Sequence, residues 1–223
     1  MLSFLGQKFK RSNRASENPL ITDGGASATR FLIPKSPEEG FLMETIFFHD
    51  KWTKLKEGGK GATTLPPYHF HWVQEEIFIV EKGAFIFEVE GKTIRVTPAD
   101  GETSVPGGDY HLFYPDTSTG EDTVMKTWAL PDYGADECFF RNLFSYLEDC
   151  KAHNIKPSLF QLLLFLHEHD ISLAIPSLPK SIGKFVGKWV MGYFGGKIIG
   201  QMVLGYKPSY EEYYAGETIK KDQ

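Results

Sequence analysis

Apolar and polar residues alternate between about residue 31 and residue 131, which predicts a series of β-strands. In FLMETIFFHDKW, Glu44 and Asp50 take the solvent side of a strand. Because successive side chains of a strand point to opposite faces, Met43, Phe47 and His49 then share the inner face.

A second segment, AFIFEVEG, alternates in the same way. Glu88 and Glu90 take the solvent side, so Phe85 and Phe87 point inward. Breaks that contain glycine or proline separate these short strands at intervals of about 8–12 residues, which is typical of an antiparallel sandwich or barrel.

After about residue 134 the hydrophobic period becomes helical. One side of the first predicted helix is formed by Phe139, Phe140, Leu143, Phe144 and Leu147. A second helix is predicted in PSLFQLLLFLHEHD, and a third apolar segment, rich in glycine, covers residues 181–206. These helices look too apolar to stand alone, so we expect them to pack on the barrel or on a dimer partner.

The chain is therefore predicted to have three parts. Residues 1–30 are expected to be poorly ordered and to contribute little to the core. Residues 31–133 form the β-barrel, and residues 134–223 form a helical C-terminal extension. A chain of 223 residues is long enough for one domain with a sizeable core and such an appendage.

The net charge of −5 argues against nucleic-acid binding, which requires a basic face. Two cysteines do not make a disulfide framework, so we expect a reducing compartment, the cytoplasm.

The segment 181–206 is long enough to suggest a membrane span, but Lys188 and Lys197 lie inside it. A lysine near the centre of a membrane helix costs about 2.5–3.5 kcal/mol on insertion. Glycines recur every four residues from Gly192, which permits close helix packing. Packing against the barrel or a dimer partner, peripheral membrane contact and a true span all stay open for this segment.

The stretch PYHFHWVQEE carries the candidate chemistry. His69 and His71 are two residues apart, so on a strand their imidazoles project from the same face. Such a pair is a good start for a site that binds a divalent transition metal, although the pair alone is weak evidence.

The surroundings of this pair resemble the cupin superfamily over roughly residues 40–131. The resemblance rests on two motifs in the family order, His69-x-His71-x4-Glu76-x6-Gly83 and Pro106-x-Gly108-x2-His111. It implies a mainly β fold, a single cupin jelly-roll barrel with a C-terminal α-helical extension, and it implies a homodimer. The whole chain is also similar to uncharacterised fungal proteins with one cupin domain.

The resemblance further implies one divalent metal ion, held by His69, His71, Glu76 and His111. Glu75 also lies within the permitted spacing from the histidines, but the distance to the motif glycine favours Glu76 as the ligand. The second motif departs from the family pattern at Asp100 and Pro115, neither of which is a ligand position.

The metal itself stays open among Fe, Mn, Ni, Co and Zn. All of these except Zn favour five or six ligands and would keep open positions beside four protein ligands. The predicted pocket lining of Met43, Phe47, Phe85 and Phe87 is apolar, and the two motifs contain no cluster of Arg or Lys that would neutralise a phosphate. A small, mostly apolar or aromatic organic molecule is therefore the expected substrate.

Two reaction types and one alternative follow. The enzyme could perform dioxygenation, or a Lewis-acid isomerisation, decarboxylation, dehydration or cyclisation at an enolisable carbonyl. In the second case Glu75, Tyr110 or His49 is the candidate for proton transfer. The alternative is a non-catalytic ligand-binding or regulatory barrel with a structural metal or none.

Overall fold

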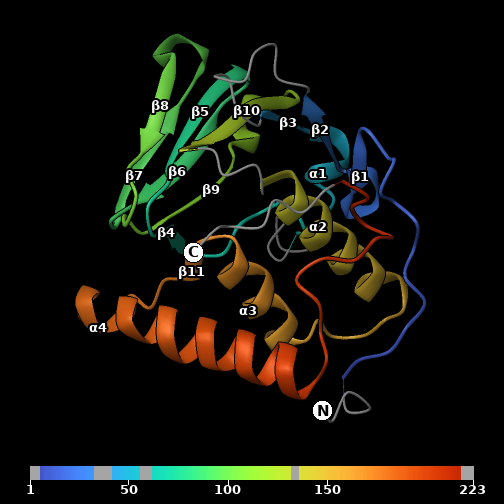
Figure 1. Ribbon diagram of the computed structural model, residues 1–223. Helices are drawn as coiled ribbons and strands as arrows, with labels where there is room; N and C mark the ends of the chain where they lie inside the picture. The colour runs from blue at the N-terminus through green and yellow to red at the C-terminus, as the bar shows by residue number, and fades with distance from the viewer. Residues whose placement is uncertain (1–5, 33–41, 56–61, 132–135, 217–223) are drawn as a thin grey trace.

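The computed structural model describes residues 6–32, 42–55, 62–131 and 136–216. Within these residues the strands form two antiparallel sheets (Figure 1). The six-stranded sheet has the spatial order β1 (Leu20–Thr22), β2 (Ser27–Leu32), β3 (Leu42–Phe47), β10 (Thr123–Leu130), β5 (Glu75–Lys82) and β8 (Glu102–Val105). The five-stranded sheet has the order β11 (Ile171–Leu173), β4 (His69–His71), β9 (His111–Pro115), β6 (Phe85–Val89) and β7 (Lys92–Val96). This architecture confirms the prediction of a mainly β jelly-roll fold with a helical C-terminal extension.

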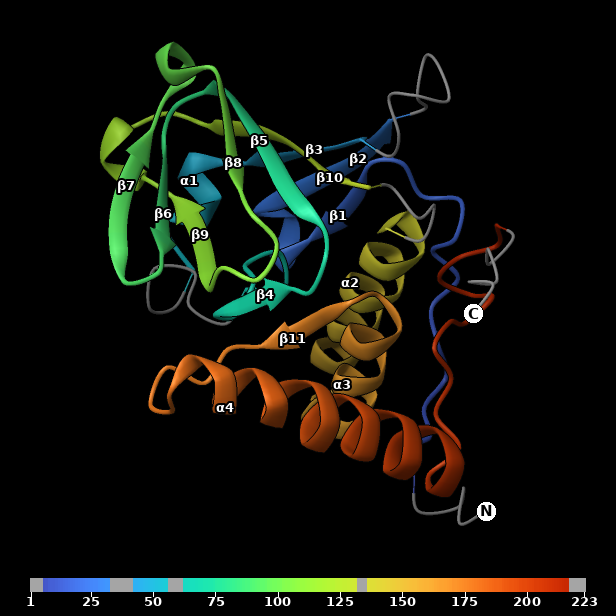
Figure 2. The ribbon, with the colours of Figure 1, turned by 60° about the vertical axis from the view of Figure 1, so that its left-hand side comes forward.

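The helices of the C-terminal extension gather on one side of the barrel, and the short α1 lies apart from them against the strands (Figure 2). α1 covers His49–Trp52; the extension has α2 (Asp136–Ala152), α3 (Leu159–Glu168) and α4 (Lys180–Phe185), which continues into a π-helix (Val186–Val203). Short 3-10 turns cover Asp23–Gly25, Pro98–Asp100 and Thr117–Thr119. None of the helices in the described ranges combines the length and the apolar character that a bilayer crossing requires.

An aromatic core fills the space between the two sheets. It is built around Phe47, Phe78, Phe85, Phe87 and Phe113, which are all buried. Their neighbouring ring centroids lie 4.9–5.6 Å apart in tilted or edge-on pairs. Such geometry is favourable for aromatic rings beyond the apolar area that they bury.

The turn from β5 to β6 explains the glycine that ends the first motif. Gly83 has a φ of +71°, and a Cβ atom there would lie 2.4 Å from the Cγ2 atom of Thr123. Only glycine satisfies both conditions, so this position is fixed by backbone geometry and packing.

The expectation that residues 1–30 contribute little to the core is wrong. Leu20 is fully buried in β1, and β2 pairs along its whole length with β3. The segment before β1 runs beside the end of the chain (Figure 2), where the backbone N–H of Arg14 donates to the carbonyl of Glu212 at 2.8 Å. The sheet therefore begins well before residue 31, because this segment finds partners that are distant in sequence.

The C-terminal extension also enters the barrel. The predicted second helix ends at Glu168, and Ile171–Leu173 forms β11, an edge strand that pairs antiparallel with β4. In this pairing Ile171 lies opposite His71, and Leu173 lies opposite His69. The extension is thus joined by a backbone ladder to the strand that carries the two histidines.

The glycines of the segment 181–206 lie on its inner side. The π-helix buries Gly187, Gly192, Gly195, Gly196 and Gly200. A Cβ atom at Gly196 would lie 2.8 Å from the backbone of Leu163, and one at Gly200 would lie 2.7 Å from the carbonyl oxygen of Phe160. The glycines therefore let this helix approach the backbone of α3 more closely than any side chain would allow.

Candidate metal centre

Three strands bring the four predicted ligands together. β4 carries His69 and His71 on one face, β9 begins with His111 directly opposite His69, and β5 supplies Glu76. All four side chains are buried, and their donor atoms lie within 4.8 Å of one another. This group could hold a metal ion.

The carboxylate of Glu76 lies at the centre of the three rings. Its Oε2 atom is 2.8 Å from Nε2 of His111, 3.4 Å from Nε2 of His71 and 3.9 Å from Nε2 of His69. Every histidine therefore turns the same ring nitrogen, Nε2, toward the carboxylate.

The outward nitrogens of the rings are held by acceptors. Nδ1 of His69 lies 2.9 Å from the carbonyl oxygen of Pro67, and Nδ1 of His111 lies 2.9 Å from that of Asp109. Since a carbonyl only accepts, each Nδ1 donates its proton and leaves the Nε2 lone pair for a ligand bond. Outer hydrogen bonds of this kind commonly orient the histidines of metal sites.

His71 is oriented by a side chain. Its Nδ1 lies 3.4 Å from Oε1 of the buried Gln74, whose Nε2 donates to the carbonyl oxygen of Pro131. The backbone of His71 is fixed as well, because the N–H of Gly108 donates to its carbonyl oxygen at 2.6 Å. Gly108, in the second motif, therefore helps to fix the backbone of the first.

Electrostatics favours the protonation states that bind metals. Burial, together with the charge of His111, lowers the pKa of His69 to about 3, so this imidazole is neutral near pH 7. Burial alone would raise the pKa of Glu76, but the neighbouring His71 and His111 outweigh it and hold that pKa well below the usual range. An ionised carboxylate and a neutral imidazole are the forms in which Glu76 and His69 can ligate a divalent transition metal.

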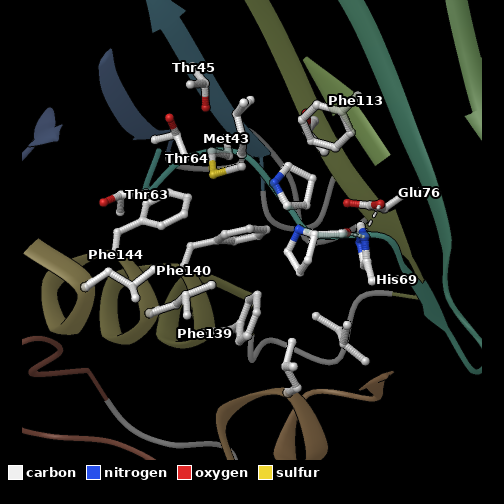
Figure 3. Close-up of a pocket in the computed structure, with 18 of the residues that line it drawn as sticks. Met43, Thr45, Thr63, Thr64, His69, Glu76, Phe113, Phe139, Phe140 and Phe144 are labelled. Atoms are coloured by element: carbon white, nitrogen blue, oxygen red, sulfur yellow. Dashed lines mark hydrogen bonds and ion pairs between the residues drawn. The ribbon is translucent and has the colours of Figure 1, made fainter. Parts of the chain in front are cut away.

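An apolar cavity of about 300 Å³ lies beside the centre (Figure 3). His69, His71 and Glu76 line one part of it. The barrel contributes further lining from Met43, Thr45, Phe47, Phe113, Met125 and Thr127. The helical extension contributes Phe139, Phe140, Leu143, Phe144 and Leu147 from α2 and Leu159, Leu162 and Leu166 from α3.

The structure places two of the four residues predicted for the pocket at this cavity. Met43 and Phe47 line the cavity. Phe85 and Phe87 do not: they point inward into the part of the aromatic core that does not reach the cavity. Phe113, which was not predicted, lines the cavity from β9.

The three candidates for proton transfer do not line the cavity. Glu75 is exposed, since it precedes Glu76 on β5 and therefore points to the opposite face. The Tyr110 hydroxyl donates to the carbonyl oxygen of Lys180 at 3.3 Å. His49 begins α1 beyond the end of β3.

Other residues around the centre were not anticipated from the sequence. The apolar side of α2 was recognised as a helix face, but nothing in its pattern showed that it borders a cavity. Gln74 gave no signal beyond its position between the histidines and Glu76.

A polar cluster around the buried Asp23 fixes α2 to the barrel at the edge of the cavity. The carboxylate of Asp23 accepts from the backbone N–H of Thr63 at 2.7 Å, from Thr64 Oγ1 at 3.0 Å and from Lys151 Nζ at 2.6 Å. Thr63 and Thr64 line the cavity, and Lys151 lies near the end of α2. Because the Asp23 carboxylate accepts both from the Thr63–Thr64 segment and from Lys151 of α2, this cluster holds the helical wall against the barrel.

No family model matches the chain. Similarity to solved structures is low: a cupin-2 domain protein from Rhodospirillum rubrum has 14% identity and a TM-score of 0.33 over 48% of this chain and 61% of that chain. The capsular polysaccharide assembling protein CapF of Staphylococcus aureus has 17% identity and a TM-score of 0.36 over 49% of this chain and 29% of that chain.

Relatives with clear sequence similarity carry oxidoreductase names. The probable oxidoreductase virH of Hypocrea virens is 37% identical over 98% of this chain and 96% of that protein. The oxidoreductase iacF of Pestalotiopsis fici is 39% identical over 76% of this chain and 81% of that protein. The epoxidase atD of Aspergillus terreus is 32% identical over 85% of this chain and 61% of that protein. The chain belongs to the family of fungal oxidoreductases that includes virH and iacF.

Proposed function

We propose that this protein is a cupin-type metalloenzyme that oxidises a small, mostly apolar organic molecule. The observation that carries the proposal is that four buried side chains able to ligate a metal lie beside an apolar cavity. His69, His71, Glu76 and His111 would hold one divalent ion. A bound ion of this kind supplies Lewis-acid and redox chemistry at the edge of the cavity.

The donor set fits such an ion. Three imidazoles with tethered Nδ1 atoms and one carboxylate give a net positive site when a divalent cation is added. Fe(II), Mn(II), Ni(II) and Co(II) take more than four ligands and keep positions for substrate, whereas Zn(II) is closer to saturation. The donor set therefore favours a metal that takes more than four ligands, and it does not choose among these four.

The cavity defines the substrate class. No Arg or Lys occurs among the described residues that line it, so nothing there would neutralise a phosphate. Phe139, Phe140 and Phe144 offer flat apolar contacts on one side. Figure 3 shows Thr45, Thr63 and Thr64 across the cavity from Glu76, where their hydroxyl groups lie beside its apolar walls. An aromatic or other apolar body with few polar substituents fits these surroundings.

The lining also bears on the reaction type. His69, His71 and Glu76 are the titratable groups among the described lining residues, and all three are committed to the metal in this proposal. A non-redox reaction at an enolisable carbonyl needs a separate acid or base, and Glu75, Tyr110 and His49 lie elsewhere. Oxidation is the function that this arrangement and the names of the relatives support best.

Elemental analysis and oxygen uptake test the proposal together. The purified chain is expected to hold one divalent ion and to consume dioxygen with a small aromatic or apolar substrate from a panel. Chelation should abolish uptake, and one metal should restore it. The enzyme proposal fails if the protein holds its metal, binds an apolar compound tightly and leaves both compound and oxygen unchanged, because that outcome describes a ligand-binding barrel.

A further inference from the structure

The outer side of the α4–π-helix segment is an exposed apolar surface. It consists of Ile182, Phe185, Trp189, Tyr193, Phe194 and Met202, which are 45–59% exposed. Figures 1 and 2 show this segment along the edge of the molecule, with α3 and β11 on its inner side. We call these six residues the outer apolar face.

The buried glycines explain why the large side chains of this segment point outward. Gly183 and Gly187 approach Tyr110 and Leu173 so closely that a Cβ atom would lie 2.9 Å and 3.2 Å from an atom of each. Along the π-helix the same close approach continues against α3. Only the glycine side can pack inward, and the aromatic residues between the glycines are held on the solvent side.

The segment that carries this face has only positively charged side chains of its own. The sequence from Ile171 to Tyr210 contains no Asp or Glu, but it contains Lys180, Lys184 and Lys188 as well as two later lysines, in a chain with net charge −5. Lys180 pairs with Glu90 and Asp109 across the barrel. In the described part of the chain, no carboxylate lies within ion-pair distance of Lys184 or Lys188. Both lysines flank the outer apolar face along the helix, and their partly buried side chains reach over rings on the barrel side, Lys184 5.4 Å from the ring centre of Phe70 and Lys188 4.5 Å from that of Trp72.

We propose that the outer apolar face binds the surface of an anionic lipid membrane. A surface helix with Trp, Tyr and Phe on one side and lysines at its border lies in the interface with its apolar side among the acyl chains. Lysines near a membrane are attracted to acidic headgroups. A second copy of the chain fits less well, because a two-fold pairing would bring the same cationic borders together without an acidic residue on either segment.

Vesicle co-sedimentation of the full-length protein tests this proposal. The probes are vesicles of phosphatidylcholine alone and vesicles of phosphatidylcholine with phosphatidylserine. The protein is expected to sediment with the acidic vesicles, and more weakly at high salt. The double substitution Phe185→Gln and Phe194→Gln should lower partition by about tenfold for each side chain that leaves the apolar phase. Lys184→Gln and Lys188→Gln should each lower it by about fivefold.

Ile94→Gln is the matched control, since Ile94 is 48% exposed on β7, outside this face. It should leave partition unchanged, and circular dichroism should show that all variants are folded. Failure of the wild-type protein to bind either kind of vesicle would overturn the proposal. It would also be overturned if sedimentation equilibrium showed a dimer that Phe185→Gln and Phe194→Gln dissociate, because a second copy would then cover this face.

Discussion

The cavity beside the metal centre has two walls of different origin. The barrel wall brings ionisable groups whose positions are fixed by backbone hydrogen bonds, as when the carbonyls of Pro67 and Asp109 hold the rings of His69 and His111. The helical wall, from α2 and α3, brings only apolar side chains. The strands thus position the reactive groups, and the helices shape the space for the substrate.

This division separates two kinds of substitution. A change among the buried donors of the barrel wall should alter metal binding and chemistry while the fold persists, since the aromatic core is built from other residues. A change in the helical wall should alter stability and substrate selection while the metal stays bound. The following predictions run from the largest expected effect to the smallest.

Glu76→Gln should nearly abolish metal binding. It removes the negative charge that lies between the three imidazoles, so its effect should exceed the roughly 10–100-fold loss typical of an outer-shell change. Metal content and affinity measured with a chromophoric chelator provide the readout. Glu75→Gln is the control, because that side chain is exposed on the other face of β5. If Glu75→Gln strips the metal and Glu76→Gln does not, the assignment is wrong by one residue.

Gln74→Leu should weaken metal affinity by roughly 10–100-fold. The substitution removes the acceptor that lies 3.4 Å from Nδ1 of His71, so the ring loses its orientation. Gln74→Glu keeps an acceptor at that place and should retain most of the affinity. Equal loss in both variants would show that the side chain does not act by orienting His71.

Phe144→Ala should lower the free energy of unfolding by about 3 kcal/mol and leave the metal content unchanged. Phe144 is buried against Leu20, Phe31 and Met43 and also lines the cavity. Denaturant unfolding and elemental analysis give the two readouts. Leu159→Ala, on the same wall but 54% exposed, should cost within about 0.5 kcal/mol. Loss of metal from folded Phe144→Ala would contradict the separation of the two walls.

Asp23→Asn should destabilise the fold by about 1–2 kcal/mol near neutral pH, because it weakens the attachment of Lys151 and Thr63 to the barrel. Burial raises the pKa of Asp23, but the hydrogen bond from Lys151 and its other partners outweigh this and lower it below the usual 3.8. The carboxylate therefore stabilises the fold above about pH 4 and loses this effect as the pH falls through the lowered pKa.

The stability difference between wild type and Asp23→Asn should accordingly shrink in acid. At the alkaline end, burial lowers the pKa of Lys151, but its hydrogen bonds with Asp23 and Glu148 outweigh this and raise it above 10.5. Its contribution is present below that value and is lost at higher pH. A difference that grows as the pH falls below 4 would contradict this account of the cluster.

The four donors of the barrel wall could be predicted from the sequence, and the helical wall could not. The strand period places His69 and His71 on one face, and the resemblance of the two motifs to a known family adds Glu76 and His111. The strand period also points Phe85 and Phe87 inward, but it does not distinguish a core from a cavity. That distinction depends on which ring fills which space between the sheets.

The remaining differences come from contacts between distant parts of the chain. In the sequence, Ile171–Leu173 reads as the end of a helix, but in the structure it forms β11 by pairing with β4, which lies about one hundred residues earlier. In the sequence, the residues before Leu20 read as a solvated tail, but in the structure Arg14 and Ala15 donate backbone hydrogen bonds to Glu212 in the C-terminal segment. Neither pairing has a local signal, because each depends on where the barrel and the helices bring their partners.

X-ray absorption spectroscopy of the protein as purified tests the central claim most directly. The account predicts one divalent transition metal per chain, with a first shell of nitrogen and oxygen at about 2.0–2.2 Å and imidazole scattering beyond it. His111→Ala should lose that signal while the protein stays folded. A protein without metal would contradict the account, as would a first shell with sulfur from the buried Cys138 or Cys150.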